Sequence, residues 1–154
     1  MSTATLTTMC AIVNGNGEWV FIDREKNWCG LALPGGHVKD NESIYECVFR
    51  EVLEETGLRL NEVQFKGLFH FFNISTHERY TVFSFISDSF SGTLKKSCSE
   101  GDLYWLRPEN IDCNQLSEGM AERFELFNSP NCLEMFVEWD EHIGKRKVRK
   151  QFLF

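Results

Sequence analysis

Residues 31–58 read LALPGGHVKDNESIYECVFREVLEETGL, and the rest of the chain is organised around them. A Pro-Gly-Gly turn at 34–36 leads into a polar loop, which leads into one helix. Ser43 followed by Glu46 has the spacing of a capping box, with Asn41 as the alternative helix cap. Gly57 is placed to end the helix just past its last turn. The apolar stripe that this helix would bury consists of Ile44, Val48 and Val52.

Three acidic residues share one face in the second half of this helix. Glu51, Glu54 and Glu55 are spaced i, i+3 and i+4. Each like-charged pair costs about 0.2–0.5 kcal/mol even on an exposed helix, and the C-terminal end of a helix disfavours anions. A divalent cation would turn this repulsion into affinity, because hard cations bind several oxygen ligands at once. The alternative interpretation is a solvated acidic face, and the residues around the face decide between the two.

Those residues resemble the Nudix box at all nine of its constrained positions. The pattern is Gly, five residues, Glu, seven residues, Arg-Glu-aliphatic, one residue, Glu-Glu, one residue and Gly-aliphatic. Its positions in this chain are Gly36, Glu42, Arg50, Glu51, Val52, Glu54, Glu55, Gly57 and Leu58. The match covers residues 36–58, and elsewhere the resemblance is one of layout. We therefore expect a single Nudix domain over 1–154 with an α/β (α+β) fold, in which a mixed β-sheet lies between helices in an α/β/α sandwich.

The resemblance also implies a metal site. Nudix enzymes cut a nucleoside diphosphate joined to another group X, while divalent ions neutralise the phosphate oxygens. By this likeness Glu51, Glu54 and Glu55 are the ligands of Mg²⁺, for which Mn²⁺ can substitute, and the carbonyl of Gly35 is a further candidate.

Other residues of the box are expected to support the carboxylates. Arg50 is expected to pair with Glu42, which would fix the loop to the helix and aim the ligands. Gly36 lets the backbone approach the metal, and Gly57 is interpreted as a structural helix stop.

The general base and the substrate contacts are less determined. Glu51 is one candidate base, and Glu100, in a polar loop before a strand, is the other; a solvated loop residue is the alternative for Glu100. Arg24 and Arg79 are candidates for binding a substrate phosphate. Candidates for contacting a base, each with a place in the core or a loop as its alternative, are Trp28, Phe69, Phe71, Trp105, Asn114 and Gln115.

The layout around the box looks most like small bacterial MutT-type nucleoside triphosphatases. Such enzymes release pyrophosphate and a nucleoside monophosphate, in some members from 8-oxo-dGTP. A second interpretation keeps the box and changes the substrate to ADP-ribose, a nucleotide sugar, a dinucleoside polyphosphate or a capped RNA end. A third is a Nudix-fold nucleotide sensor without catalysis, although such proteins usually lose box carboxylates and none is missing here.

Composition excludes some partners and leaves others open. The chain has 154 residues and a net charge of −7, which argues against general nucleic-acid binding because a phosphate track needs a basic surface. The one dense basic run, residues 145–150, is interpreted as a solvated strand or tail. No membrane span or signal peptide is expected, and the oligomeric state stays open, a homodimer included.

Six cysteines without metal-ligand spacing are interpreted as free thiols of a reducing cytoplasm. Alternation and turn signals predict strands at 5–13, 18–23, 29–33, 62–74, 79–87 and 102–106, the first two joined as a hairpin. Residues 108–110 are expected to form a short turn or helix and 117–127 a second helix. Residues 135–139 and 148–154 are expected to pair as a hairpin, with a helix over 133–142 as the alternative.

Overall fold

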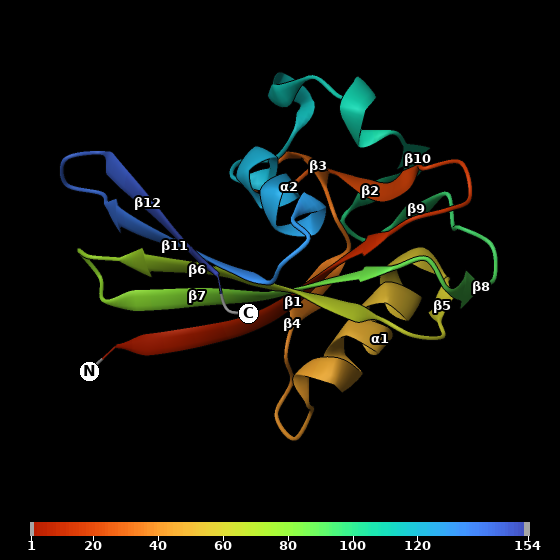
Figure 1. Ribbon diagram of the computed structural model, residues 1–154, viewed down its shortest axis with the longest axis horizontal. Helices are drawn as coiled ribbons and strands as arrows, with labels where there is room; N and C mark the ends of the chain where they lie inside the picture. Colours follow the sequence, from red (N-terminus) through yellow and green to blue (C-terminus); the bar gives the residue numbers. More distant parts are fainter. Residues whose placement is uncertain (1, 153–154) are drawn as a thin grey trace.

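The computed structural model describes residues 2–152, which are organised around a six-stranded mixed sheet (Figure 1). Its strands are β1 (Thr3–Ile12), β4 (Gly35–His37), β6 (Gln64–Asn73), β7 (Glu78–Ser87), β11 (Leu133–Asp140) and β12 (Lys145–Phe152). They lie in the order β12-β11-β6-β7-β1-β4. β1 runs parallel to β7 and β6 runs parallel to β11, while the other neighbours are antiparallel.

One helix packs on each face of this sheet, α1 (Ile44–Thr56) below it and α2 (Met120–Asn128) above it in Figure 1. Successive residues of β1 therefore face two different cores. Ala11 packs in the cluster that includes α2, and Ile12 packs in the cluster that includes α1. Burial on both faces explains why β1 ends as a continuous apolar run. The expected mixed sheet between helices is confirmed.

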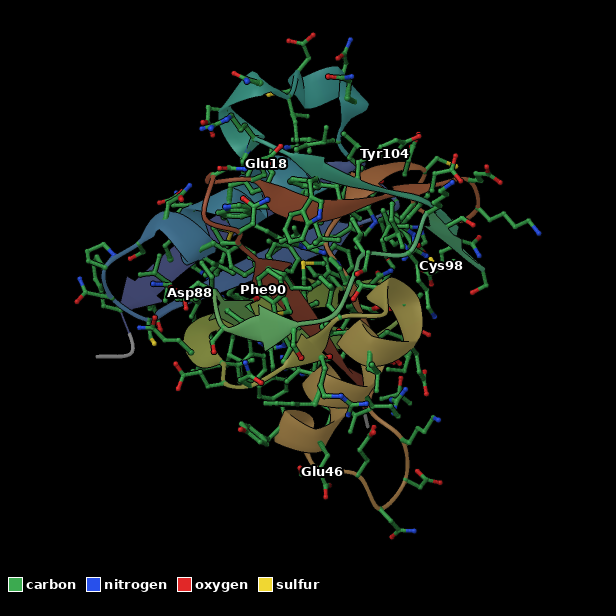
Figure 2. All side chains as sticks on the ribbon, turned by 90° about the vertical axis from the view of Figure 1, so that its right-hand side faces the viewer. Glu18, Glu46, Asp88, Phe90, Cys98 and Tyr104 are labelled. Atoms are coloured by element: carbon green, nitrogen blue, oxygen red, sulfur yellow. The ribbon has the colours of Figure 1, made fainter. Side chains whose placement is uncertain are left out.

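A second, four-stranded antiparallel sheet lies on the α2 side of the central sheet. Its strands are β2 (Trp19–Arg24), β3 (Gly30–Ala32), β9 (Ser97–Cys98) and β10 (Gly101–Leu106), in the order β3-β2-β10-β9. The remaining elements are the pair β5 (Arg59–Leu60) and β8 (Phe90–Ser91) and the 3-10 turns Pro108–Asn110 and Cys113–Gln115. Figure 2 shows Cys98 of β9 beside the end of α1 that lies opposite Glu46. The turn between β9 and β10 is thereby brought to the C-terminal half of α1.

The ends of α1 follow the sequence prediction. The Ser43 hydroxyl accepts a hydrogen bond from the Glu46 backbone N–H, and the Glu46 carboxylate accepts one from the Ser43 N–H, which completes the capping box. Gly57 ends the helix with φ of 78°, a left-handed conformation that favours glycine.

Two expected elements differ from the structure. The turn at 14–17 forms, but the strands on either side do not make a hairpin ladder and share only an isolated bridge, Val13 to Trp19. Both edges of β1 are already paired, with β7 and β4, so the chain after the turn joins the other sheet. The second helix begins at Met120 instead of 117, because the Ser117 N–H still donates to the Leu31 carbonyl.

The other predicted elements are present with small shifts of their ends. Residues 64–73 and 78–87 pair antiparallel, and a short 3-10 turn forms at 108–110. The hairpin near the C-terminus is confirmed as β11 and β12, so the alternative helix over 133–142 is wrong. The last two residues of the expected 148–154 strand lie outside the described residues.

Candidate active site

Arg50 is the centre of the charge network on α1. Its Nε donates to Glu42 Oε1 at 2.5 Å and its Nη2 to Glu42 Oε2 at 3.0 Å, a bidentate pair that fixes the loop before the helix. The Nη2 also donates to the His37 carbonyl at 3.1 Å. Together with the Lys39 backbone N–H, the Arg50 guanidinium lowers the pKa of Glu42 to about 2. The expected pairing of Glu42 with Arg50 is confirmed.

The same guanidinium also holds two of the three acidic residues. Arg50 Nη1 donates to Glu51 Oε1 at 2.8 Å and to Glu54 Oε2 at 3.1 Å. The Glu51 side chain is 16% exposed, whereas that of Glu54 is 55% exposed. Glu51 lies against Gly36, where an added Cβ would overlap its carboxylate. Gly36 is therefore needed for the position of the Glu51 side chain.

Glu55 is the acidic residue that turns inward. Its Oε1 accepts a long hydrogen bond from the Gly35 N–H at 3.4 Å, and its Oε2 is buried without any hydrogen-bond partner within residues 2–152. Burial, reinforced by the negative charges of Glu100 and Glu51, raises the pKa of Glu55 to about 9. A side chain added at Gly35 would overlap the Thr8 carbonyl, so this close approach requires glycine.

Glu100 reaches the site from the turn between β9 and β10. Its Oε2 accepts a hydrogen bond from Arg24 Nη1 at 3.0 Å, and both side chains are about a quarter to a third exposed. β2 and β10 pair so that Arg24 lies opposite Gly101, which explains why the two meet. The structure thus brings Arg24 and Glu100, both predicted site residues, to the box carboxylates.

Arg79 lies elsewhere. It is in β7, where its Nη1 contacts His70 Nε2 at 3.0 Å and its guanidinium stacks 4.5 Å from the Phe72 ring centroid. β7 meets β1 at Ala4 beside Arg79 and at Met9 beside Ser84, and Met9 is the residue that pairs with Gly35. Arg79 is therefore five residues along the strand from the site, and its placement does not support contact with the same phosphates.

The aromatic candidates for base contact fall into different environments. Phe69 is buried, and Trp105 stacks on Phe90 with ring centroids 5.7 Å apart. Trp28 is 61% exposed in the loop after Arg24, whose Nε donates to the Asn27 carbonyl. Its indole ring is open to a ligand. Sequence reasoning did not single out Arg123 of α2, a half-buried residue whose Nε has no hydrogen-bond partner within residues 2–152, because nothing near it in the sequence distinguishes it from the other charges of that helix.

Whether these residues fit a divalent cation can be judged from their oxygens. As the side chains stand, no three or more His, Cys, Asp or Glu residues within 2–152 lie close enough together to hold a metal ion. The reason is that Arg50 draws Glu51 and Glu54 toward itself. The donor set nevertheless fits, because the unpartnered oxygen of Glu55 is buried near Glu51 and Glu100, and hard cations prefer such carboxylate oxygens.

Comparisons with known proteins agree with this geometry. A model of the NUDIX domain matches residues 3–127. The Nudix hydrolase YvcI of Bacillus subtilis is 36% identical over 101 residues, which cover 64% of this chain and 63% of that relative's length. Among solved structures, the MutT protein of Bacillus halodurans superposes with a TM-score of 0.78 at 21% identity, covering 96% of this chain and 97% of that one. The NUDIX domain of Shewanella oneidensis NrtR, solved with ADP ribose, gives 0.64 at 13% identity and covers 82% and 88% of the two chains.

The arrangement of a mixed sheet with a helix on each face is thus shared with these solved structures. The chain belongs to the Nudix family, as the nine positions of the box indicated. Within residues 2–152, the helices are too short or too polar to cross a membrane.

Proposed function

We propose that this protein is a Mg²⁺-dependent Nudix hydrolase that cleaves a phosphoanhydride bond of a nucleoside diphosphate derivative. The narrower proposal is a MutT-like nucleoside triphosphate pyrophosphohydrolase, with 8-oxo-dGTP among its candidate substrates. The observation that carries the proposal is Glu55, a buried carboxylate whose Oε2 has no partner in the described chain and which lies close to Glu51 and Glu100. A protein built only for stability would avoid such a group, since burying a polar oxygen without a hydrogen-bond partner is costly.

Glu51, Glu54 and Glu55 would hold the cation, with the Gly35 carbonyl as a further ligand. When bound, Mg²⁺ supplies Lewis-acid stabilisation of phosphate charge and lowers the pKa of a coordinated water. The raised pKa of Glu55 favours its protonated form, and a proton on this carboxyl must leave before it can serve as a ligand. Glu54 must likewise exchange its contact with Arg50, which its 55% exposure permits.

Arg24 and Glu100 supply the substrate contact and one candidate base. In this structure they neutralise each other. A substrate phosphate competes with the Glu100 carboxylate for the Arg24 guanidinium, because both are anions that accept charge-assisted hydrogen bonds. Release from Arg24 leaves Glu100 free to accept a proton from the attacking water, with Glu51 as the alternative base. Arg50 orients the box carboxylates, because its two hydrogen bonds to Glu42 fix the position of its guanidinium.

A second candidate substrate is ADP-ribose. The support is the likeness in fold to the NrtR NUDIX domain, which was solved with ADP ribose. Nucleotide sugars, dinucleoside polyphosphates, capped RNA ends and a sensor role without catalysis are further alternatives that the same assay separates.

The test is a screen of nucleoside triphosphates, 8-oxo-dGTP, ADP-ribose, nucleotide sugars, dinucleoside polyphosphates and capped RNA with Mg²⁺ or Mn²⁺. Release of pyrophosphate from a triphosphate supports the MutT-like activity, and turnover of ADP-ribose alone supports the alternative. Binding of nucleotide without turnover of any compound would contradict an enzymatic role.

We further propose that the protein acts in the cytoplasm and binds a small nucleotide. The six cysteines are free thiols, and Cys29 and Cys113 are exposed, which suits a reducing compartment.

A further inference from the structure

Arg123 lies on the sheet face that α2 covers. Its guanidinium sits 4.3 Å from the ring centroid of Phe69, a residue of β6 that is only 2% exposed. Phe69 pairs with Val82 of β7, Val82 pairs with Thr7 of β1, and Thr7 pairs with His37 of β4. Paired residues of neighbouring strands point to the same face of a sheet. Arg123 is therefore placed over the face that also carries His37.

The Arg123 guanidinium lacks any acceptor within residues 2–152. Its Nε is buried without a hydrogen bond, and no carboxylate forms an ion pair with it. Burial lowers the pKa of Arg123 to about 10, so it is charged at neutral pH. The neighbouring Glu122 carboxylate pairs instead with Arg146, at 2.5 Å. A buried N–H donor without an acceptor lowers the stability of the folded protein, because it has lost its hydrogen bonds to water.

The other arginines of the charged clusters have partners. Arg24 binds Glu100, Arg149 binds Glu138, and Arg79 contacts a ring nitrogen of His70. The buried Lys66 donates to the Ser129 carbonyl at 2.6 Å. Arg123 thus differs from these cations, because its buried Nε has no hydrogen-bond acceptor within residues 2–152.

A continuous path joins Arg123 to the box. Tyr80, two residues before Val82, points to the same face, is 37% exposed and packs edge-on against His37 with ring centroids 6.2 Å apart. His37 directly follows Gly35 and Gly36, which contact the box carboxylates. Three strand spacings of about 4.8 Å separate β4 from β6, so Arg123 lies about 14 Å across the sheet from Gly35. That span is comparable to an extended nucleoside triphosphate.

We propose that Arg123 is a specificity-determining residue that donates hydrogen bonds to an exocyclic keto oxygen of the substrate's base. The proposal rests on the proposed function, since it assumes that the phosphates occupy the box. It narrows the substrate class to nucleotides whose base carries a keto group at the edge that reaches α2, as in 6-oxopurines or 4-oxopyrimidines.

The chemistry of the guanidinium sets this preference. Arginine has only N–H donors and no acceptor, so it can bind a keto oxygen but not an exocyclic amino group. An adenine or cytosine amino group facing Arg123 would leave donors on both sides unpaired. Sites built to hydrogen-bond one substrate group discriminate strongly against an analogue that cannot make that bond.

The test compares ITP with ATP, which differ only in the 6-keto group with its N1–H and the 6-amino group. Binding is measured by calorimetry with Mg²⁺ on the Glu54→Gln variant, in which we expect the fold to survive and turnover to be too slow to obscure affinity. We expect ITP to bind about tenfold more tightly than ATP. Adding Arg123→Met, which keeps an unbranched side chain over Phe69, should bring the ratio close to one by weakening ITP alone. Arg123→Lys should retain part of the preference.

The matched control is Arg146→Met, which removes a neighbouring cation that already has a partner, Glu122. It should leave the ITP-to-ATP ratio unchanged. Equal affinity of the two nucleotides, an unchanged ratio in Arg123→Met, or no binding of either nucleotide would each overturn the inference. If the wild-type protein turns over no triphosphate while the Arg123-dependent preference is present, the proposed activity fails and the assignment of Arg123 stands.

Discussion

Two segments of this molecule are dense in charge, and they differ in how that charge is neutralised. In β12 three of the five cations each pair with a separate anion: Arg146 with Glu122, Arg149 with Glu138 and Lys150 with Glu125. At α1 the guanidinium of Arg50 contacts Glu42, Glu51 and Glu54, and within residues 2–152 no cation pairs with Glu55. Figure 1 shows the two segments at opposite ends of the central sheet.

Charge density alone therefore does not identify a ligand site. In the sequence, the basic run 145–150 looks at least as conspicuous as the acidic residues of the helix. The acidic residues that pair with this basic run lie in α2 and β11, so the sequence of the run alone does not reveal them. A surplus of one sign that the fold leaves uncompensated, as at Glu55, is the feature that indicates a missing partner.

Replacing the proposed metal ligands Glu54 and Glu55 should have the largest effect on activity. We expect Glu55→Gln and Glu54→Gln each to lower kcat by about a hundredfold or more, because each removes an oxygen ligand of the metal. Steady-state kinetics with Mg²⁺ on the substrate found in the screen provides the measurement. Circular dichroism and thermal unfolding should show that the fold survives, since glutamine at position 55 no longer buries a titratable group.

The matched control for these variants is Glu138→Gln, which removes a carboxylate from a neutralised pair. Its kcat should equal that of the wild type. Full activity of both helix variants would refute the metal assignment.

Arg50→Lys should have the next largest effect. Lysine cannot reproduce the two parallel hydrogen bonds to Glu42 and the simultaneous contact with Glu51, because it is a point charge and not a planar fork. We expect activity to fall about 10–100-fold, as for other residues that orient metal ligands. If kcat/KM with Mg²⁺ stays at the wild-type level, Arg50 does not aim the carboxylates.

Added metal should stabilise the folded protein through Glu55. At a metal concentration of about 100 times the dissociation constant, the free energy of unfolding should rise by about 2.7 kcal/mol. For a chain of this size that corresponds to a rise in Tm of about 5–10 °C. Differential scanning fluorimetry with MgCl₂ or MnCl₂, reversed by EDTA, measures the shift. A wild-type Tm indifferent to both ions, or an equal shift in Glu55→Gln, would contradict the site.

The local part of this site was predictable from the sequence, and the non-local part was not. The capping box of Ser43, the stop at Gly57 and the pair of Arg50 with Glu42 all depend on spacings within a few turns of chain. β2 does not pair with β1 because β4 and β7 already occupy both edges of β1. One of these partners, β7, lies some 75 residues further along the chain, so the local sequence does not predict this. Arg123 escaped notice for the same reason, because its lack of a partner is a property of the fold and not of α2.

The ion pair between Arg50 and Glu42 should make the free energy of unfolding depend on pH in the acid range. The folded-state pKa of Glu42 is about 2, below its ordinary value of 4.5, so its contribution is present above pH 4.5 and is lost as the pH falls toward 2. Urea unfolding of the wild type should show this loss, and Glu42→Gln should show a shallower dependence over the same pH range. Parallel pH profiles for the two proteins would mean that Arg50 does not hold Glu42 in solution.

The smallest effect is expected at the neutralised segment. Lys150 and Glu125 are each about half exposed, and such surface ion pairs contribute about 0–1 kcal/mol. Lys150→Met should therefore change the free energy of urea unfolding by less than about 1 kcal/mol and leave kcat unchanged. Salt should reduce even this difference, because exposed charges are screened over about 10 Å at 0.1 M ionic strength. A large loss of activity in Lys150→Met would show that β12 reaches the substrate, and the distinction between a neutralised and an uncompensated charge cluster would fail.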